Sequence, residues 1–250
     1  MKAFQKYLGA IAPGKKCLLV TCGDNNGAMN YYLRELGGEW CWAHMGTTNI
    51  AEMSDLLGDK VVKAEDNHLP FPDNYFDYTL SIDVHEHLKD PQAFSAELRR
   101  ISKIQGQILI TVPDGDKRKL VNVLKEKIGM TREVYGHTRD GYSIAEIKSI
   151  MNKANIHPQR SSTFSRFFTE LLELGLNFLY VKVLAGKSMA AVNPGTIAPR
   201  TEDQLKSVEK SYRIYSLIYP FFWMFSQLDK LLFFTEGYVV IVEGQKRQSN

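Results

Sequence analysis

The stretch VVKAEDNHLPFPDNYFDYTLSIDVHEHLKDPQAFSAELRRISKIQGQILITVPD, at Val61–Asp114, decides the fold. It contains three apolar runs, and polar side chains gather where those runs end. Acidic residues follow the first run, and Asp83, His85, Glu86 and His87 follow the second. In open α/β sheets, ligands bind at the carboxyl ends of the strands. The stretch therefore predicts a binding site at one edge of an α/β sheet.

Strand-like runs alternate with helical patterns on both sides of this stretch. The predicted strands are Lys16–Thr21, Glu39–Met45, Lys60–Ala64, Phe76–Ile82, Gln107–Val112, His157–Phe164 and Gly237–Val242. Helix starts are marked by Thr47 or Thr48, by Asp90 followed by Pro91, and by Ser143 with Glu146 three residues later. This alternation predicts an α/β fold with a doubly wound, mostly parallel sheet.

The motif at 65–91 resembles the class I S-adenosylmethionine-dependent methyltransferases, in the type 11 group that methylates small molecules and lipids. The resemblance is carried by Glu65-Asp66, the loop Leu69–Asp77, Glu86-His87-Leu88, Asp90-Pro91 and Gly106. It implies a Rossmann-like sheet of seven strands, the last antiparallel to its neighbours. It also implies methyl transfer from S-adenosylmethionine to oxygen or nitrogen of a small or lipid-linked acceptor.

The same resemblance assigns a set of cofactor contacts. Glu65 or Asp66 would bond the adenine amino group, and Asp83 and His87 would line the methionine end of the cofactor. The glycines after the first strand would let backbone N–H groups approach the ligand. The full expected set is Cys22, Gly23, Asp24, Asn25, Gly27, Met45, Glu65, Asp66, Asn67, Asp83 and His87.

Two departures from the family pattern favour an alternative. Leu19 and Asn25 replace an acid and a glycine of the family's first motif, and Ala43–Thr47 holds no acid to grip the ribose hydroxyls. Asp24, Asn25 or His44 could substitute for that acid. The alternative is a non-catalytic protein with this fold and a degenerate cofactor site. A nicotinamide-dependent oxidoreductase is disfavoured, because no G-x-G-x-x-G follows the first strand.

Histidine suits a general base near neutral pH, and His85 is absent from the family pattern. We therefore predict that His85 is the catalytic base. Asp83, His85 and His87 also offer three metal-ligand types, but HExxH helical spacing is absent and no distant Cys/His pair completes a site. No metal is expected. A simpler interpretation of Glu86-His87 is that the pair caps and packs the following helix.

The loop at 136–142 precedes a helix and is rich in polar groups. Loops after the fifth strand shape the acceptor site in the methyltransferase family. His137, Arg139 and Tyr142 are therefore candidate substrate-binding residues for a polar head group. A solvated loop at the entrance to the helix explains the same composition equally well.

About seventy residues before the last predicted strand are not needed for the sheet. We expect a methyltransferase-like core at 1–164 and 236–250, with a helical insertion or lid at 165–235. Phe167, Phe168, Leu171 and Leu174 recur at helical spacing, as do Tyr215, Ile218, Tyr219 and Phe222. The aromatics are either buried in a helical pair packed on the sheet, or they form a lid over an apolar acceptor or a surface that sits in a bilayer interface.

Composition limits the other function classes. The net charge of +3 is too small to indicate nucleic-acid binding, and three cysteines without a CxxC pair favour free thiols in a reducing cytosol. The best candidate for a membrane span, Ile214–Phe234, is interrupted by polar residues and Pro220, and its apolar part, Ile214–Phe225, is well short of the ~20 residues of a span. The N-terminus lacks the apolar core of a signal peptide. We expect a cytoplasmic protein that can contact a membrane surface through 165–235.

Overall fold

The computed structural model describes residues 2–23, 27–46, 50–65, 67–179, 181 and 220–247. Its strands are β1 (Ile11–Cys22), β2 (Gly37–Met45), β3 (Val61–Ala64), β4 (Phe76–Ile82), β5 (Ser102–Pro113), β6 (Ile156–Phe164) and β7 (Val239–Lys246). Its helices are α1 (Lys2–Leu8), α2 (Ala28–Glu35), α3 (Ile50–Leu57), α4 (Pro91–Ile101), α5 (Leu120–Lys127), α6 (Ile144–Lys153) and α7 (Phe167–Phe178), with 3-10 turns η1 (His85–His87) and η4 (Gln227–Leu232).

The strands form one sheet in the order β3-β2-β1-β4-β5-β7-β6. β1 pairs in parallel with both β2 and β4, so the strand order reverses there. β7 runs antiparallel to β5 and β6, while the other pairs are parallel. The predicted doubly wound, mostly parallel sheet of seven strands is therefore confirmed. Ligands of such sheets bind beyond the carboxyl ends of the strands, where the order reverses.

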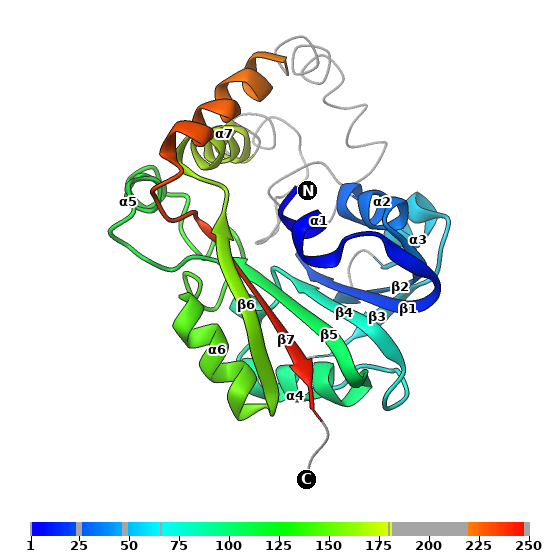
Figure 1. Cartoon of the computed structure of the whole chain (residues 1–250). Helices are drawn as coiled ribbons and strands as arrows, with labels where there is room; N and C mark the ends of the chain where they lie inside the picture. The colour runs from blue at the N-terminus through cyan, green and yellow to red at the C-terminus, as the bar shows by residue number, and fades with distance from the viewer. Residues whose placement is uncertain are drawn as a thin grey trace.

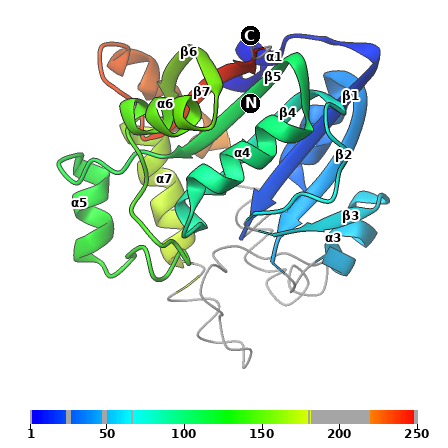
Figure 2. The same ribbon diagram turned by 90° about the horizontal axis from the view of Figure 1, so that it is seen from below.

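Apolar side chains cover both faces of the sheet, and a separate hydrophobic core lies on each side. On one face α4 and α6 pack with Phe94 and Met151 against the strands. On the other, α1, α2 and α3 pack around Phe4 and Trp42. Figures 1 and 2 show these two helical layers with the sheet between them. Helices on both faces explain why the segments Leu18–Val20 of β1 and Ile108–Ile110 of β5 are apolar and buried at every position, without alternation.

Two predicted helix starts are confirmed by their caps. An Asp90 carboxylate oxygen accepts hydrogen bonds from the backbone N–H of Gln92 and Ala93, with Pro91 at the first helical position. Ser143 and Glu146 form a reciprocal capping box at α6. Each arrangement satisfies backbone donors that the first turn of a helix leaves free. Thr47 and Thr48 lie outside the described residues.

Helical segments lie between β6 and β7, as the surplus of residues suggested. α7 holds Phe167, Phe168, Leu171 and Leu174, and residues 220–226 are also helical. The side chain of Asp229 in η4 accepts hydrogen bonds from the backbone N–H of Arg166 and Phe168, at 3.0 and 2.8 Å. This contact fixes η4 at the N-terminus of α7. Tyr215, Ile218 and Tyr219 fall outside the described residues. No described helix has the length and apolarity that crossing a bilayer requires.

Candidate functional site

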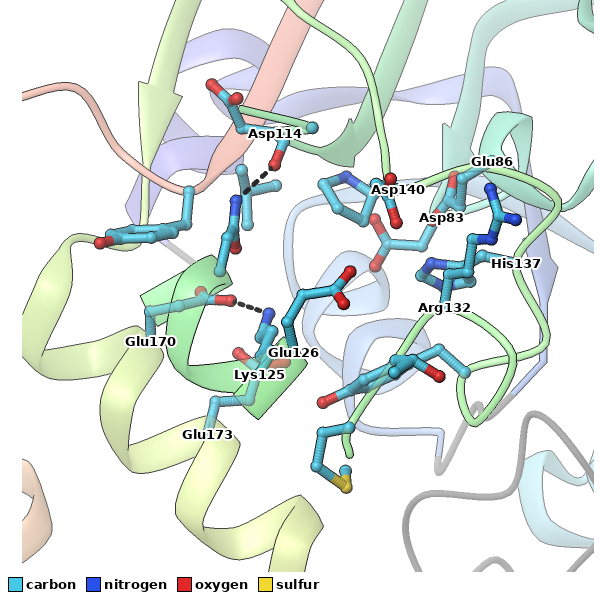
Figure 3. Close-up of a pocket in the computed structure, with 18 of the residues that line it drawn as sticks. Asp83, Glu86, Asp114, Lys125, Glu126, Arg132, His137, Asp140, Glu170 and Glu173 are labelled. Atoms are coloured by element: carbon cyan, nitrogen blue, oxygen red, sulfur yellow. Dashed lines mark hydrogen bonds and ion pairs between the residues drawn. The ribbon is translucent and has the colours of Figure 1, made fainter. Parts of the chain in front are cut away.

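A cleft opens at the carboxyl edge of the sheet, and Figure 3 shows the side chains around it. Cys22 and Gly23 reach it from the end of β1, Asp83 from the end of β4, and Asp114 from the end of β5. α5, the segment 130–140 and α7 form its outer wall. We call this space the strand-end cleft. Its position is where the strand-end polar residues predicted a binding site.

Asp83 projects from the turn that follows β4 (Figure 3). Its backbone has the left-handed φ of 51°, and its N–H donates to the carbonyl oxygen of Thr111 at 3.1 Å. The side chain is open to the cleft, but surrounding protein removes water from it and raises its pKa to about 6, with a smaller effect from the negative charge of Glu170. Asp83 is therefore a carboxyl group that can exchange a proton near neutral pH.

The outer wall carries further carboxyl groups on α7. Glu170 is buried and accepts a hydrogen bond from Lys125 at 2.7 Å, while Glu173 faces the cleft. Desolvation, followed by repulsion from Glu170, raises the pKa of Glu173 to about 7. The sequence analysis did not include Glu170 and Glu173 among the site residues. The sequence could have indicated Glu170, because this acid lies one helical turn before Leu174 on the apolar face of α7.

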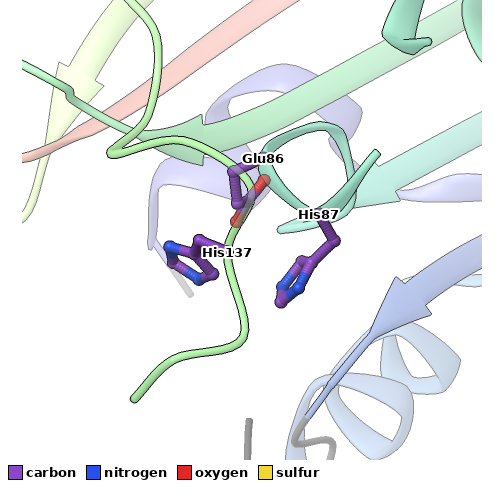
Figure 4. Close-up of side chains that lie close together, drawn as sticks. All are labelled: Glu86, His87 and His137. Atoms are coloured by element: carbon purple, nitrogen blue, oxygen red, sulfur yellow. The ribbon is translucent and has the colours of Figure 1, made fainter. Parts of the chain in front are cut away.

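The side chains of Glu86, His87 and His137 lie close together, as Figure 4 shows. Glu86 and His87 belong to η1, whereas His137 comes from the loop before α6. The rings of His87 and His137 lie edge to face with their centroids 4.6 Å apart. Two further contacts join the segments. His87 Nδ1 lies 2.9 Å from the Gly136 carbonyl oxygen, and the Thr138 N–H donates to the Glu86 carbonyl oxygen at 2.8 Å.

The prediction that His85 is a base at the acceptor is contradicted by its burial. The side chain is 0% exposed and lies between the hydroxyls of Ser81 and Ser95, at 3.2 and 3.0 Å from its two ring nitrogens. Burial lowers its pKa to about 3. The ring also packs edge-on against Phe94. His85 is a neutral core residue that ties β4 to α4, and it cannot reach a ligand in the cleft.

The expected substrate contacts separate into two groups. His137 lines the strand-end cleft, and its substrate-binding role remains a prediction. Tyr142 does not, because it is 1% exposed and its hydroxyl donates to the carbonyl oxygen of His85. The Arg139 guanidinium stacks on the Tyr142 ring at 3.8 Å and pairs with Glu146 at 2.8 Å. Both contacts stabilise the entrance to α6. The burial of Tyr142 contradicts its predicted head-group role, while the role of the partly exposed Arg139 remains a prediction.

The expected cofactor contacts also divide by position. Cys22, Gly23, Asp83 and His87 line the strand-end cleft together. Gly27 precedes α2 with a φ of 78°, Met45 is buried at the end of β2, and Glu65 and Asn67 are exposed in the turn after β3. Asp24, Asn25 and Asp66 lie outside the described residues. The roles assigned to all of these residues remain predictions.

The end of β2 has no carboxylate, as its sequence indicates. His44 is buried there, and its Nε2 donates to the carbonyl oxygen of Gly23 at 3.1 Å. The bond joins the ends of β1 and β2, which are adjacent through the register Thr21↔His44. His44 therefore fixes the backbone of the loop after β1. Because Nε2 already donates to the Gly23 carbonyl oxygen, it is not available to bind the ribose hydroxyls in place of the acid that β2 lacks.

Comparisons with known proteins show similarity to methyltransferases, both in sequence and in fold. Residues 18–110, from β1 to β5, match the family model described as a methyltransferase domain. Over 72 residues the chain is 38% identical to an uncharacterized protein of Methanocaldococcus jannaschii. That match covers 29% of this chain and 29% of the relative, so the chain spans less than a third of the curated relative's length.

Two solved structures illustrate the likeness in fold. A methyltransferase-like protein of Bacillus halodurans C-125 superposes with a TM-score of 0.57, at 13% identity and over 98% of both chains. The Haemonchus contortus phosphoethanolamine N-methyltransferase 2, solved in complex with S-adenosyl-L-methionine, superposes with a TM-score of 0.56 at 18% identity. The superposition covers 99% of this chain and 52% of that one. The resemblance indicated by the motif at 65–91 is confirmed.

Proposed function

We propose that this chain, whose residues 18–110 match the methyltransferase-domain family model, is a class I methyltransferase that uses S-adenosylmethionine to methylate nitrogen or oxygen of a small acceptor. One observation supports this most: β1 and β4, both inside the matched domain, direct Gly23, Asp83 and His87 into a single cleft. The cofactor's methionine end would lie near Gly23 and Asp83. Its adenine would lie toward the turn after β3, near Glu65.

Methyl transfer from a sulfonium requires the protein mainly to position the acceptor and the cofactor. The acceptor's lone pair attacks the methyl carbon in line, the carbon–sulfur bond breaks, and its electrons return to sulfur. The proton lost by the acceptor needs a base. Asp83 is the candidate, because it faces the cleft and its pKa is raised to about 6. Glu170 is paired with Lys125, so the further negative charge comes from Glu173 once the pH exceeds its pKa of about 7, and this charge favours a cationic sulfonium and a cationic or hydroxyl-bearing acceptor.

The role of Asp83 is tested by Asp83→Asn, which keeps the side-chain shape and removes the carboxylate. Methyl transfer from radiolabelled S-adenosylmethionine into fractionated amines, phenols and lipids identifies an acceptor. With that acceptor, we expect turnover to fall by about 10²–10⁴-fold, the range of general-base catalysis. Asp55→Asn, an exposed carboxylate on α3, is the matched control. Equal turnover in Asp83→Asn and Asp55→Asn would remove Asp83 from the mechanism.

A lipid-linked acceptor is favoured by the apolar surface around η4. Phe221, Trp223, Phe233 and Phe234 are all more than half exposed in this segment. Exposed aromatics in one region are typical of a contact with lipid or a partner. Co-sedimentation with liposomes tests this version, with Trp223→Ser/Phe233→Ser/Phe234→Ser as the comparison. We expect the wild-type chain to sediment and the triple variant to stay in the supernatant. If the wild type and the triple variant sediment equally, the lipid-linked acceptor is rejected in favour of a water-soluble one.

A further inference from the structure

The contact between η1 and the loop before α6 brings together three groups that bind metals. One ligand atom from each of Glu86, His87 and His137 lies within 4.8 Å of the other two (Figure 4). His137 is fifty residues from His87 in the chain, so spacing in the sequence gives no hint of the group. Two imidazoles and a carboxylate form a known ligand set for first-row transition metals.

The Glu86 carboxylate is buried without any group in the described part of the protein that would stabilise it. Its side chain is 0% exposed, and neither carboxylate oxygen has a hydrogen-bond partner among the described residues. A buried carboxylate without a partner is strongly unfavourable, and native proteins pair such groups or use them as ligands. A cation at this point would supply the partner that the carboxylate lacks.

The two histidines are held in a state that suits coordination. Because a carbonyl oxygen only accepts, the contact at 2.9 Å means that His87 Nδ1 donates to Gly136 and Nε2 keeps its lone pair. A carbonyl acceptor behind a histidine is the usual way to fix the ring of a metal ligand. The His137 ring packs edge to face against the His87 ring with the centroids 4.6 Å apart, so the second imidazole is held beside the first.

We propose that Glu86, His87 and His137 bind one divalent first-row transition-metal cation, with Zn²⁺ or Mn²⁺ as the expected ions. Two imidazole ligands disfavour Mg²⁺ and Ca²⁺, which prefer oxygen. Three protein ligands leave a coordination position open for water or a ligand, and all three residues line the strand-end cleft, as Asp83 does. Metal binding at this site does not depend on the proposed methyl transfer.

Calorimetric titration of the chelator-treated, dialysed protein with ZnCl₂ and with MnCl₂ tests the site, without S-adenosylmethionine present. We expect saturable binding of one cation per chain by the wild type. His137→Ala and Glu86→Gln should each weaken binding by about tenfold or more. His157→Ala, an exposed histidine on β6, should bind as the wild type does. Circular dichroism of each variant confirms that it is folded.

Spectroscopy identifies the ligands independently of affinity. We expect added Co²⁺ to give a visible d–d absorption band in the wild type and in His157→Ala, and a weaker or shifted band in His137→Ala. The proposal is overturned if the folded wild type binds neither ion saturably, or if His137→Ala and Glu86→Gln bind like the wild type. A third result also overturns it: Glu86→Gln is more stable than the wild type and binding is unchanged. Glu86 would then be a protonated core residue.

Discussion

Replacing His85 by leucine separates a structural role from a catalytic one. The ring bridges Ser81 on β4 and Ser95 on α4, and all three side chains are 0% exposed. Leucine fills a similar volume but cannot form a hydrogen bond to either hydroxyl. The two serine hydroxyls would then lose a buried partner. We therefore expect His85→Leu to lower the free energy of unfolding rather than to act on the chemical step.

The size of the effect follows from the contacts. Each lost hydrogen bond is worth about 1 kcal/mol net, and each buried hydroxyl left unpaired costs about 1–3 kcal/mol, partly relieved by rotation of the hydroxyl. The expected loss is about 2–4 kcal/mol. For a chain of this size, ~1 kcal/mol corresponds to about 2–4 °C in the melting temperature. The variant should therefore melt roughly 5–15 °C below the wild type.

The pH dependence gives a second, independent signature. The folded-state pKa of His85 is lowered from 6.5 to about 3, so between these values the unfolded chain binds the extra proton. The wild type therefore loses stability from this residue as pH falls below 6.5, by about 1.4 kcal/mol per pH unit. His85→Leu lacks this contribution. The stability gap between the two proteins should narrow by about 1.4 kcal/mol between about pH 7.5 and about pH 5.5.

Urea unfolding followed by tryptophan fluorescence measures both quantities, in buffer with a chelator so that no metal contributes. His157→Leu on the exposed side of β6 is the control, and its unfolding free energy should change by less than about 0.5 kcal/mol. The reasoning is refuted if His85→Leu unfolds like the control and its stability gap is independent of pH. Loss of turnover without loss of stability would restore His85 as a base.

The other predictions concern a cap, a backbone position and the cleft carboxylate. Ser143→Ala removes the capping box of α6 and should cost about 1 kcal/mol of unfolding free energy, or roughly 2–4 °C in a thermal melt. Gly141→Ala should leave little folded protein in a solubility and melting assay, because its φ is 134° and a Cβ would lie 2.2 Å from the Pro113 carbonyl oxygen. Gly175→Ala in α7, where a Cβ meets nothing within 4 Å, should instead raise stability by about 0.5–1 kcal/mol. Turnover should rise with pH through about 6 as Asp83 loses its proton, and Asp83→Asn should abolish that limb of the pH–rate profile.

The sheet was predictable because its determinants are local. Apolar runs such as Phe76–Ile82 and cap pairs such as Ser143 with Glu146 act within a few residues of each other, and both are found where the pattern placed them. The start of β1 was not predictable from its composition. Residues 11–15 include a proline and a glycine, and only Ile11 pairs with β2, through Gly37.

The site was predicted in outline and missed in detail. Strand-end residues such as Gly23, Asp83 and His87 meet because the carboxyl ends of neighbouring parallel strands lie at one edge. Whether a histidine faces the cleft or the core depends on the turn that follows the strand. That turn buries His85 and Glu86 and leaves Asp83 open. His137 reaches the cleft through the Thr138 contact with Glu86, a long-range bond that no local pattern encodes.

Calorimetric titration with S-adenosylhomocysteine tests the central claim most directly, because it needs no knowledge of the acceptor. We predict saturable binding of one ligand per chain in the micromolar range, although the end of β2 lacks the usual acid. The charge-assisted bonds of that acid are each worth about 1.5–3 kcal/mol, so their loss lowers affinity by tenfold or more without abolishing it. No detectable binding at millimolar ligand, by protein shown to be folded in the same sample, would contradict the account. The non-catalytic alternative would then be favoured.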